Sequence, residues 1–161
     1  MRRLFPLLLV AIVLGVAISC NSNKSESNID SIADINMKEG EKYIANQLKN
    51  DPSFTKTETG LCYKILNEGE GENVTPTDTV DVIYTGKHVD GTEFDSSKGE
   101  IVPFPLQGVV PGFREVITLM KPGAKAIAII PSHLGYGDAG QGSIGPKETL
   151  VFELTTVGIH K

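Results

Sequence analysis

The sequence has no tryptophan, only two cysteines and no block of basic residues. Proteins that bind nucleic acid need clustered Lys and Arg against the phosphates, whereas this chain carries a formal net charge of −5. The sequence therefore argues against a nucleic-acid partner. If Cys20 is modified, as its surroundings suggest, Cys62 is left without a partner for an intramolecular disulfide.

The usual catalytic and metal-binding motifs are also missing. His88, His133 and His160 lie far apart and show no metal-ligand spacing. No Gly-x-Ser-x-Gly elbow occurs, and Cys62 falls within a predicted strand, where an inert core thiol is expected. The glycine-rich segment 135–145 lacks the Gly-Lys-Ser/Thr ending of a phosphate loop. No metal and no cofactor are therefore expected.

The amino terminus has the features of an export signal. Met1-Arg2-Arg3 is a positive start, and Leu4 to Ile18 is almost wholly apolar. That run is shorter than the roughly 20 residues that a membrane-spanning helix needs, and it suits the apolar region of a secretory signal. The segment Val16-Ala17-Ile18-Ser19-Cys20 resembles the cleavage site of a bacterial lipoprotein, with Ala17 in place of the preferred Leu.

A lipoprotein signal over residues 1–19 predicts that Cys20 is lipidated and becomes the mature N-terminus. Each methylene buried in the bilayer contributes about 0.8 kcal/mol, so several acyl chains hold a protein firmly. The expected location is therefore outside the cytoplasm, lipid-anchored to a bacterial envelope membrane. The alternative is an ordinary signal or a short anchor, with Cys20 incidental.

Three segments are expected after the signal. Residues 20–35 are rich in Asn, Ser and Asp without an apolar period, which predicts a flexible tether. Apolar residues recur at helical spacing from Met37 to Lys49, so segment 36–60 is a helical lead-in. A packing or solvated role is expected for this helix. Residues 61–161 form the folded domain.

Within that domain, alternating or apolar runs predict strands, and one short segment predicts a helix. Phe113, Val116, Ile117 and Met120 follow the i, i+3, i+4, i+7 pattern of a helix over 112–120. The strand at 101–106 belongs at an edge or bulge, because its two prolines donate no ladder bonds. The other strands are expected at 61–66, 79–85, 124–130 and 149–157.

These elements predict an α+β fold. A sheet with one apolar face needs a cover, and the helix over 112–120 is the candidate inside the domain. We therefore expect a twisted antiparallel β-sheet wrapped around one short α-helix, preceded by the signal and the tether. The glycine-rich segment from Gly135 to Pro146 is expected to be a long loop at one end of the sheet.

One short stretch carries most of the chemistry. Phe94-Asp95-Ser96-Ser97 follows a predicted Asp90-Gly91 turn and places a ring, a carboxylate and two hydroxyls side by side. The few aromatic residues of the domain fall mostly at the edges of the predicted elements. This distribution indicates a single apolar pocket that many elements line.

The motifs of this region resemble the FKBP family of peptidyl-prolyl isomerases. They occur in the family's order and approximate spacing, and the match covers residues 79–159. They are Tyr84-Thr85-Gly86, Asp90-Gly91, Phe94-Asp95-Ser96-Ser97, Pro103-Phe104, Val110-x-Gly112-Phe113, Met120-x-x-Gly123, Ile130-Pro131, Tyr136-Gly137 and Thr149-Leu150-Val151-Phe152.

The resemblance implies a prolyl isomerase that acts on proline-containing polypeptides. It assigns Tyr84, Phe94 and Asp95 to catalysis, and it implies that Tyr136 and the backbone N–H of Ile144 grip the peptide. A monomer is expected. The full set implied for substrate binding is Phe104, Val109, Val110, Phe113, Tyr136, Ile144 and Phe152.

A purely structural role is the alternative for several of these residues. Phe113 and Phe152 also suit the core, and Tyr84 alternates within a strand, where it would only pack. An acid placed like Asp95 also caps turns. The sequence alone leaves these alternatives open.

Three departures from the family pattern bear on function. Phe113 stands where the family usually has Trp, which predicts a roomier pocket floor. Glu100 aligns with a common Arg, and Gly145 replaces the first proline of Ile-Pro-Pro, which predicts a looser loop. Of these changes, Phe113 and Gly145 keep open a rival function, a binding or chaperone module with little isomerase activity.

Overall fold

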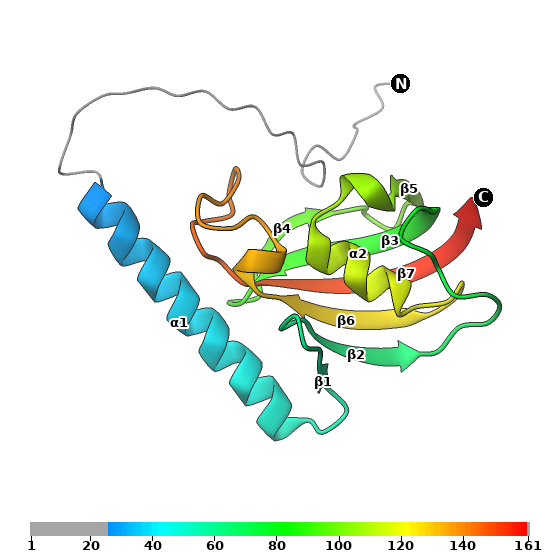
Figure 1. Cartoon of the computed structure of the whole chain (residues 1–161), viewed down its shortest axis with the longest axis horizontal. Coiled ribbons are helices and arrows are strands. Elements are labelled where there is room, and N and C mark those ends of the chain that lie inside the picture. The colour runs from blue at the N-terminus through cyan, green and yellow to red at the C-terminus, as the bar shows by residue number, and fades with distance from the viewer. Residues whose placement is uncertain (1–25, 161) are drawn as a thin grey trace.

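The computed structural model describes residues 26–160, which form one antiparallel sheet with a helix on each face (Figure 1). Seven strands are arranged in the order β1-β2-β6-β7-β3-β4, and β5 also pairs with β3. This arrangement confirms the predicted α+β class. The elements are α1 (Glu26–Asn50), β1 (Thr55–Lys56), β2 (Cys62–Asn67), β3 (Thr79–His88), β4 (Glu93–Ser96), β5 (Val102–Pro105), the 3-10 turn η1 (Leu106–Gly108), α2 (Pro111–Thr118), β6 (Lys125–Ile130), the 3-10 turn η2 (Ser132–Leu134) and β7 (Leu150–His160).

Strand β5 is an edge strand, as its prolines require. Pro103 and Pro105 lie opposite Asp81 and Thr79 of β3, and no further strand is paired with β5 within residues 26–160. A proline has no N–H to donate, so it is tolerated where one side of the strand remains unpaired. The edge position predicted from the sequence is confirmed.

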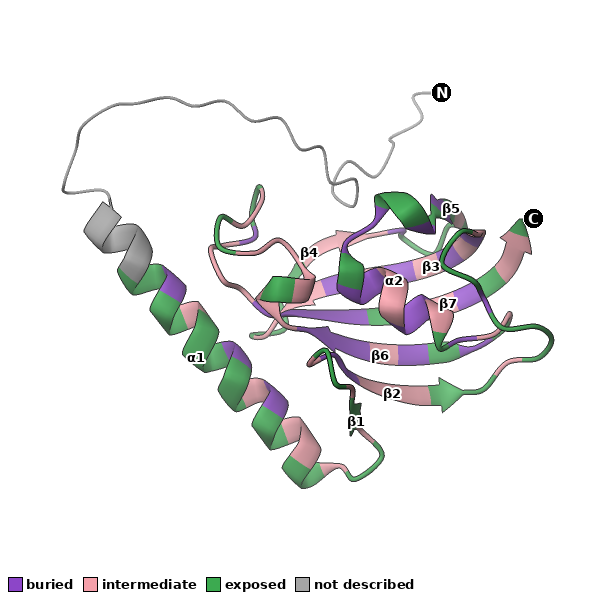
Figure 2. Ribbon diagram, viewed as in Figure 1, coloured by how far each residue is buried: buried purple, intermediate pink, exposed green. Residues whose placement is uncertain are grey.

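Helix α2 covers one face of the sheet. Phe113, Val116 and Ile117 of the helix, with Met120 just beyond its end, are fully buried, as their spacing predicts. Figure 2 shows the buried stretches of α2 in purple. Burial of each such side chain contributes about 1.5–3 kcal/mol. The helix begins at Pro111, one residue earlier than expected, because a proline suits the first helical position, where no N–H partner is needed.

Helix α1 is longer than the sequence predicts. It begins at Glu26, so residues 26–35 are helical and not the flexible tether expected there. The missing apolar period misled the prediction, because tertiary contacts support this part. Ala33 is buried, and the side chain of Asn36 donates a hydrogen bond to the carbonyl of Pro146. The predicted signal, Cys20 and the first residues of the tether lie outside the described residues.

The second half of α1 packs on the face of the sheet opposite α2. Ile44 forms a small apolar cluster with Cys62, Ile129 and Val151 of strands β2, β6 and β7. Cys62 is therefore a buried free thiol beneath a helix, in keeping with an inert core role. Within residues 26–160, neither helix combines the length and the apolar character needed to span a bilayer.

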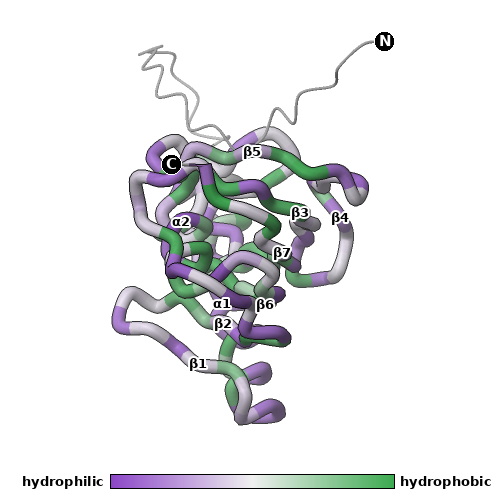
Figure 3. Tube along the Cα trace, turned by 90° about the vertical axis from the view of Figure 1, so that its right-hand side faces the viewer, coloured by the Kyte–Doolittle hydropathy of each residue, from purple (hydrophilic) through white to green (hydrophobic). Residues whose placement is uncertain are grey.

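The apolar clusters on the two faces of the sheet differ in size. The cluster beneath α2 is continuous and includes side chains from β3, β5, β6 and β7, whereas the cluster beneath α1 contains four buried residues. In the side view of Figure 3, hydrophobic stretches gather in the strands. The larger cluster contains most of the residues predicted to form the site.

Candidate functional site

Five aromatic rings from five elements meet between α2 and the sheet. The centroid of Phe113 lies 5.4 Å from that of Phe104, 5.5 Å from that of Phe152 and 6.4 Å from that of Tyr84. Phe94 lies 5.6 Å from Phe152, with the two planes at 86°. Edge-to-face pairs of this kind are favourable beyond their burial. We call these five residues the ring cluster.

The approach of these rings depends on a glycine in β3. A Cβ atom at Gly86 would lie 2.6 Å from Cζ of Phe94 and 2.9 Å from Cε1 of Phe152. Any other residue would therefore push the two rings apart. The sequence points to Gly86 only through the family resemblance. The available signal was a glycine on the inward side of an otherwise alternating strand.

A polar corner borders the ring cluster. The hydroxyl of Tyr84 donates a hydrogen bond to Oδ2 of Asp95 at 2.8 Å. The turn that follows is bonded by its own serines: the Lys98 N–H donates to Oγ of Ser96, and the Glu100 N–H donates to the carbonyl of Ser97. Asp95 therefore faces the ring cluster, and the alternative of a turn-capping acid does not describe it.

Two tyrosine hydroxyls near Asp95 remain protonated over the physiological range. Burial raises the pKa of Tyr84 far above its ordinary value, and its hydrogen bond to Asp95 raises this pKa further. Burial, with a smaller contribution from the Asp95 charge, raises the pKa of Tyr136 to about 12. The corner therefore combines a carboxylate with two phenols that stay neutral.

The other predicted lining residues join the same apolar cluster. Val109, Val110 and Ile144 are buried there, and Tyr136 packs against it while half-buried. The structure thus brings together all ten residues that the sequence assigned to the site. Their exposure differs, however. Phe113, Phe152 and Tyr84 are fully buried, so a ligand would meet the half-buried Phe94, Asp95 and Tyr136 first.

One expected contact is already used within the protein. The backbone N–H of Ile144 donates to the carbonyl of Gln141 at 2.9 Å, and the Gln141 N–H returns a bond to the Ile144 carbonyl. The prediction that this N–H grips a peptide therefore needs correction, because the loop turns tightly here and satisfies its own amides. Ile144 contributes its buried side chain instead.

The histidines divide into two kinds. His133 lies in η2, is exposed and contacts the carbonyl of Thr59 through Nε2 at 2.8 Å, as suits a loop histidine. His88 lies at the end of β3, where Nδ1 is 2.5 Å from Oε1 of Glu148. Its imidazole packs edge-on against Phe94, with centroids 5.2 Å apart. Sequence reasoning missed this contact with the ring cluster.

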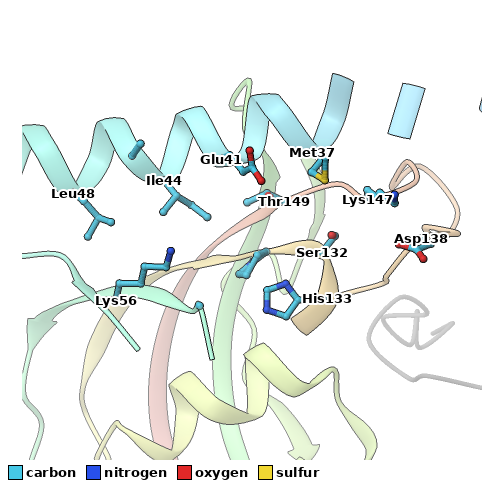
Figure 4. Close-up of a pocket in the computed structure, with 13 residues that line it drawn as sticks. Met37, Glu41, Ile44, Leu48, Lys56, Ser132, His133, Asp138, Lys147 and Thr149 are labelled. Carbon is cyan, nitrogen blue, oxygen red and sulfur yellow. The ribbon is translucent and has the colours of Figure 1, made fainter. Parts of the chain in front are cut away.

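A separate recess of about 580 Å3 lies along α1 (Figure 4). Met37, Ile44 and Leu48 line it from the helix, and His133 and Lys56 line it from the domain. None of the residues that line this recess belongs to the predicted site. It borders η2 and the end of the following loop, so α1 lies beside both ends of that loop.

Comparisons with known proteins point to one family. The sequence model of one protein family, described as FKBP-type peptidyl-prolyl cis-trans isomerase, matches residues 70–157. The chain is 47% identical over 124 residues to the "FKBP-type 22 kDa peptidyl-prolyl cis-trans isomerase" of Escherichia coli, covering 75% of this chain and 60% of that protein. It is 45% identical over 130 residues to a probable FKBP-type isomerase, FkpA, of Neisseria meningitidis, covering 79% and 47% of the two chains.

Solved structures agree with these matches. The crystal structure of FkpA from Escherichia coli superimposes with a TM-score of 0.80 at 35% identity, covering 84% of this chain and 64% of that one. A peptidyl-prolyl cis-trans isomerase from Pseudomonas syringae superimposes with a TM-score of 0.74 at 29% identity, covering 80% and 96%. The chain spans about half to three fifths of the curated relatives it matches.

Proposed function

This chain belongs to the family of FKBP-type peptidyl-prolyl cis-trans isomerases, and we propose that it isomerises X-Pro bonds in exported or envelope polypeptides. The observation that carries the proposal is the ring cluster bordered by the hydrogen bond between Tyr84 and Asp95. This combination offers an apolar surface for a prolyl ring beside polar atoms that meet its carbonyl.

The reaction needs no nucleophile. An X-Pro bond turns slowly because amide resonance imposes a barrier of about 18–20 kcal/mol. The planar amide is polar and bonded to water, whereas the twisted transition state has lost its resonance. An apolar surface that removes water therefore disfavours the planar form more strongly.

The free energy available from desolvation is large enough for such an acceleration. An amide left without hydrogen bonds costs roughly 2–7 kcal/mol, and a thousandfold acceleration requires about 4 kcal/mol. Partial desolvation, together with tighter binding of the twisted form, therefore accounts for an enzyme-like rate. No proton has to be transferred in this mechanism.

Individual residues take distinct parts. Phe94 and Phe104 form walls for the prolyl ring above the buried Phe113. The Tyr84 hydroxyl and the Asp95 carboxylate place polar atoms against the twisted amide, and Tyr136 contacts the peptide from the loop. Because Tyr84 stays protonated, its hydroxyl goes on donating to Oδ2 of Asp95 throughout the working pH range, and its oxygen is the polar atom left for the amide.

The test is an NMR exchange measurement on an Ala-Pro peptide with the purified protein. We expect cis and trans signals to exchange far faster than the uncatalysed interconversion, which takes roughly 10–100 s. A folded protein without any rate enhancement would overturn the proposal. It would instead favour the rival function, a module that docks or holds unfolded chains.

The proposed location rests on the amino-terminal sequence alone. A positive start, an apolar run and Cys20 support export, followed by lipid attachment to a bacterial envelope membrane. In that setting the clients are proteins that fold outside the cytoplasm. Mass spectrometry of the mature N-terminus tests this part, and an unmodified Cys20 would refute it.

A further inference from the structure

The loop from Gly135 to Pro146 presents two residues to the ring cluster, so its position matters to the site. It carries Tyr136 near the start and Ile144 near the end. Its own bonds include the pair between Gln141 and Ile144 and a bond from the Lys147 N–H to the carbonyl of Gly137 at 3.0 Å. These bonds shape the loop but do not join it to β3 or α1.

Glu148 supplies the connection to β3. Its Oε2 accepts a hydrogen bond from the N–H of Gly145 at 2.6 Å, and its Oε1 lies 2.5 Å from Nδ1 of His88. The side chains of Glu148 and His88 are only 15% and 17% exposed. A carboxylate with two such partners, shielded from water, forms strong and directional bonds.

This connection ends at the ring cluster. The imidazole of His88 packs edge-on against Phe94, which is one of the half-buried members of the site. One carboxylate therefore links the end of the loop to a wall of the predicted binding surface. Ile144, through its neighbour Gly145, and Phe94, through His88, are thereby both connected to Glu148.

Helix α1 supports the same end of the loop from outside. The Asn36 side-chain amide donates to the carbonyl of Pro146 at 2.8 Å. At Gly40 the helix approaches so closely that a Cβ atom would lie 2.0 Å from Oγ1 of Thr149. Asn36, His88, Gly145 and Glu148 border a common recess of about 510 Å3.

Gly145 fits this arrangement. Its N–H, which a proline would lack, is the donor to Glu148. A Cβ atom there would lie 2.8 Å from Nδ2 of Asn36. Glu148 therefore holds the N–H of Gly145, and Asn36 holds the carbonyl of Pro146 beside it. The looser loop expected from this glycine stays a prediction.

We propose that Glu148 is a positioning residue for the substrate-binding loop, with Asn36 of α1 as its second support. The inference rests on the proposed isomerase function. Glu148 touches no reacting atom and acts through Gly145 and His88. Loss of the carboxylate lets the loop separate from Phe94, so the peptide is gripped less tightly in both its planar and its twisted forms.

The direct test compares Glu148→Ala, Glu148→Gln and the unmodified full chain. We expect Glu148→Ala to raise KM about tenfold with little change in kcat, because the lost bonds involve a charged group. A glutamine accepts from Gly145 and donates to His88, so Glu148→Gln should restore most of the affinity. Glu58→Ala, at an exposed position, is the matched control and should leave KM unchanged.

The contribution of α1 is tested separately. Asn36→Ala should raise KM about threefold, because one neutral hydrogen bond is lost. Asn46→Ala is the matched control, since it makes the same change at an exposed position of the same helix. Gly145→Ala should displace Asn36 and raise KM similarly. Adding Gly145→Ala to Asn36→Ala should cost little further, because the new Cβ then meets only Oε2 of Glu148, at 3.3 Å.

Amide hydrogen exchange separates this inference from the proposed function. In Glu148→Ala we expect faster exchange at Gln141, Ile144 and Lys147, with β6 and β7 unchanged. That result supports positioning even if the unmodified protein shows no isomerase activity, which would defeat only the proposed function. Unchanged loop exchange, or exchange raised throughout the sheet, would overturn the positioning role, as would an unchanged KM in an active enzyme.

Discussion

The two helices pack on opposite faces of one sheet and differ in what they stabilise. Helix α2 has 8 residues and buries Gly112, Phe113, Val116 and Ile117 in the main core. Helix α1 has 25 residues, yet within 31–50 it buries only Ala33, Gly40 and Ile44. Length is therefore a poor guide to energetic weight. The short helix packs into the main core and carries Phe113 of the ring cluster, while the long helix covers the small cluster around Ile44 and bonds the loop at Pro146.

The largest effect should come from the α2 face. Phe113→Ala removes a fully buried ring that contacts Tyr84, Phe104 and Phe152. We expect the free energy of unfolding to fall by about 3–5 kcal/mol in urea denaturation. Leu119→Ala, at an exposed position just beyond the helix, is the control and should stay within about 0.5 kcal/mol. A small loss at Phe113 would remove the contrast between the helices.

The corresponding change on the α1 face should cost less. Ile44 is 8% exposed and lines the recess of Figure 4, so water can occupy part of the space left by Ile44→Ala. We expect the free energy of unfolding to fall by about 2 kcal/mol, at the low end for such truncations. Ile35→Ala, where the side chain is 52% exposed, should leave stability nearly unchanged. Equal losses for Ile44 and Phe113 would show that both faces are equally important.

Alkaline pH should weaken the α2 face through Tyr84. Folding raises the pKa of Tyr84 above the ordinary value of 10.0. The contribution of this group to the free energy of unfolding is therefore complete below about pH 10. It falls as the pH rises further, because only the unfolded chain releases the proton. For this buried tyrosine the slope is about 1.4 kcal/mol per pH unit. Denaturation at pH 7, 10 and 11 measures it. Tyr84→Phe should reduce the slope, and an unchanged slope would exclude Tyr84 as its source.

The smallest expected change in free energy concerns activity. Asp95→Asn keeps an oxygen that accepts from Tyr84 but removes the charge that we propose lies beside the peptide carbonyl. We expect kcat/KM to fall about fivefold, which corresponds to about 1 kcal/mol of transition-state stabilisation. Asp90→Asn, an equal charge change in the exposed turn, is the control. Equal activity in the two variants would remove Asp95 from the proposed mechanism.

Some of the site was readable from the chain because short-range rules governed it. The helical spacing of Phe113 to Met120 identified the face that α2 buries, and the prolines of β5 identified an edge strand. The ten site residues came from the family resemblance, and the structure places them together. Their roles in catalysis and binding stay predictions. The structure shows only that they are neighbours.

The sequence by itself determined which residues are apolar, which strands alternate and which short helix covers them, because these patterns depend on neighbours within a few positions. Only the tertiary structure decided the start of α1 at Glu26, the need for Gly86 and the contacts of Glu148. His88 and Glu148 are 60 residues apart, and Asn36 and Pro146 are 110 apart. Such pairs leave no local periodicity, because their contact depends on how the sheet and both helices pack together.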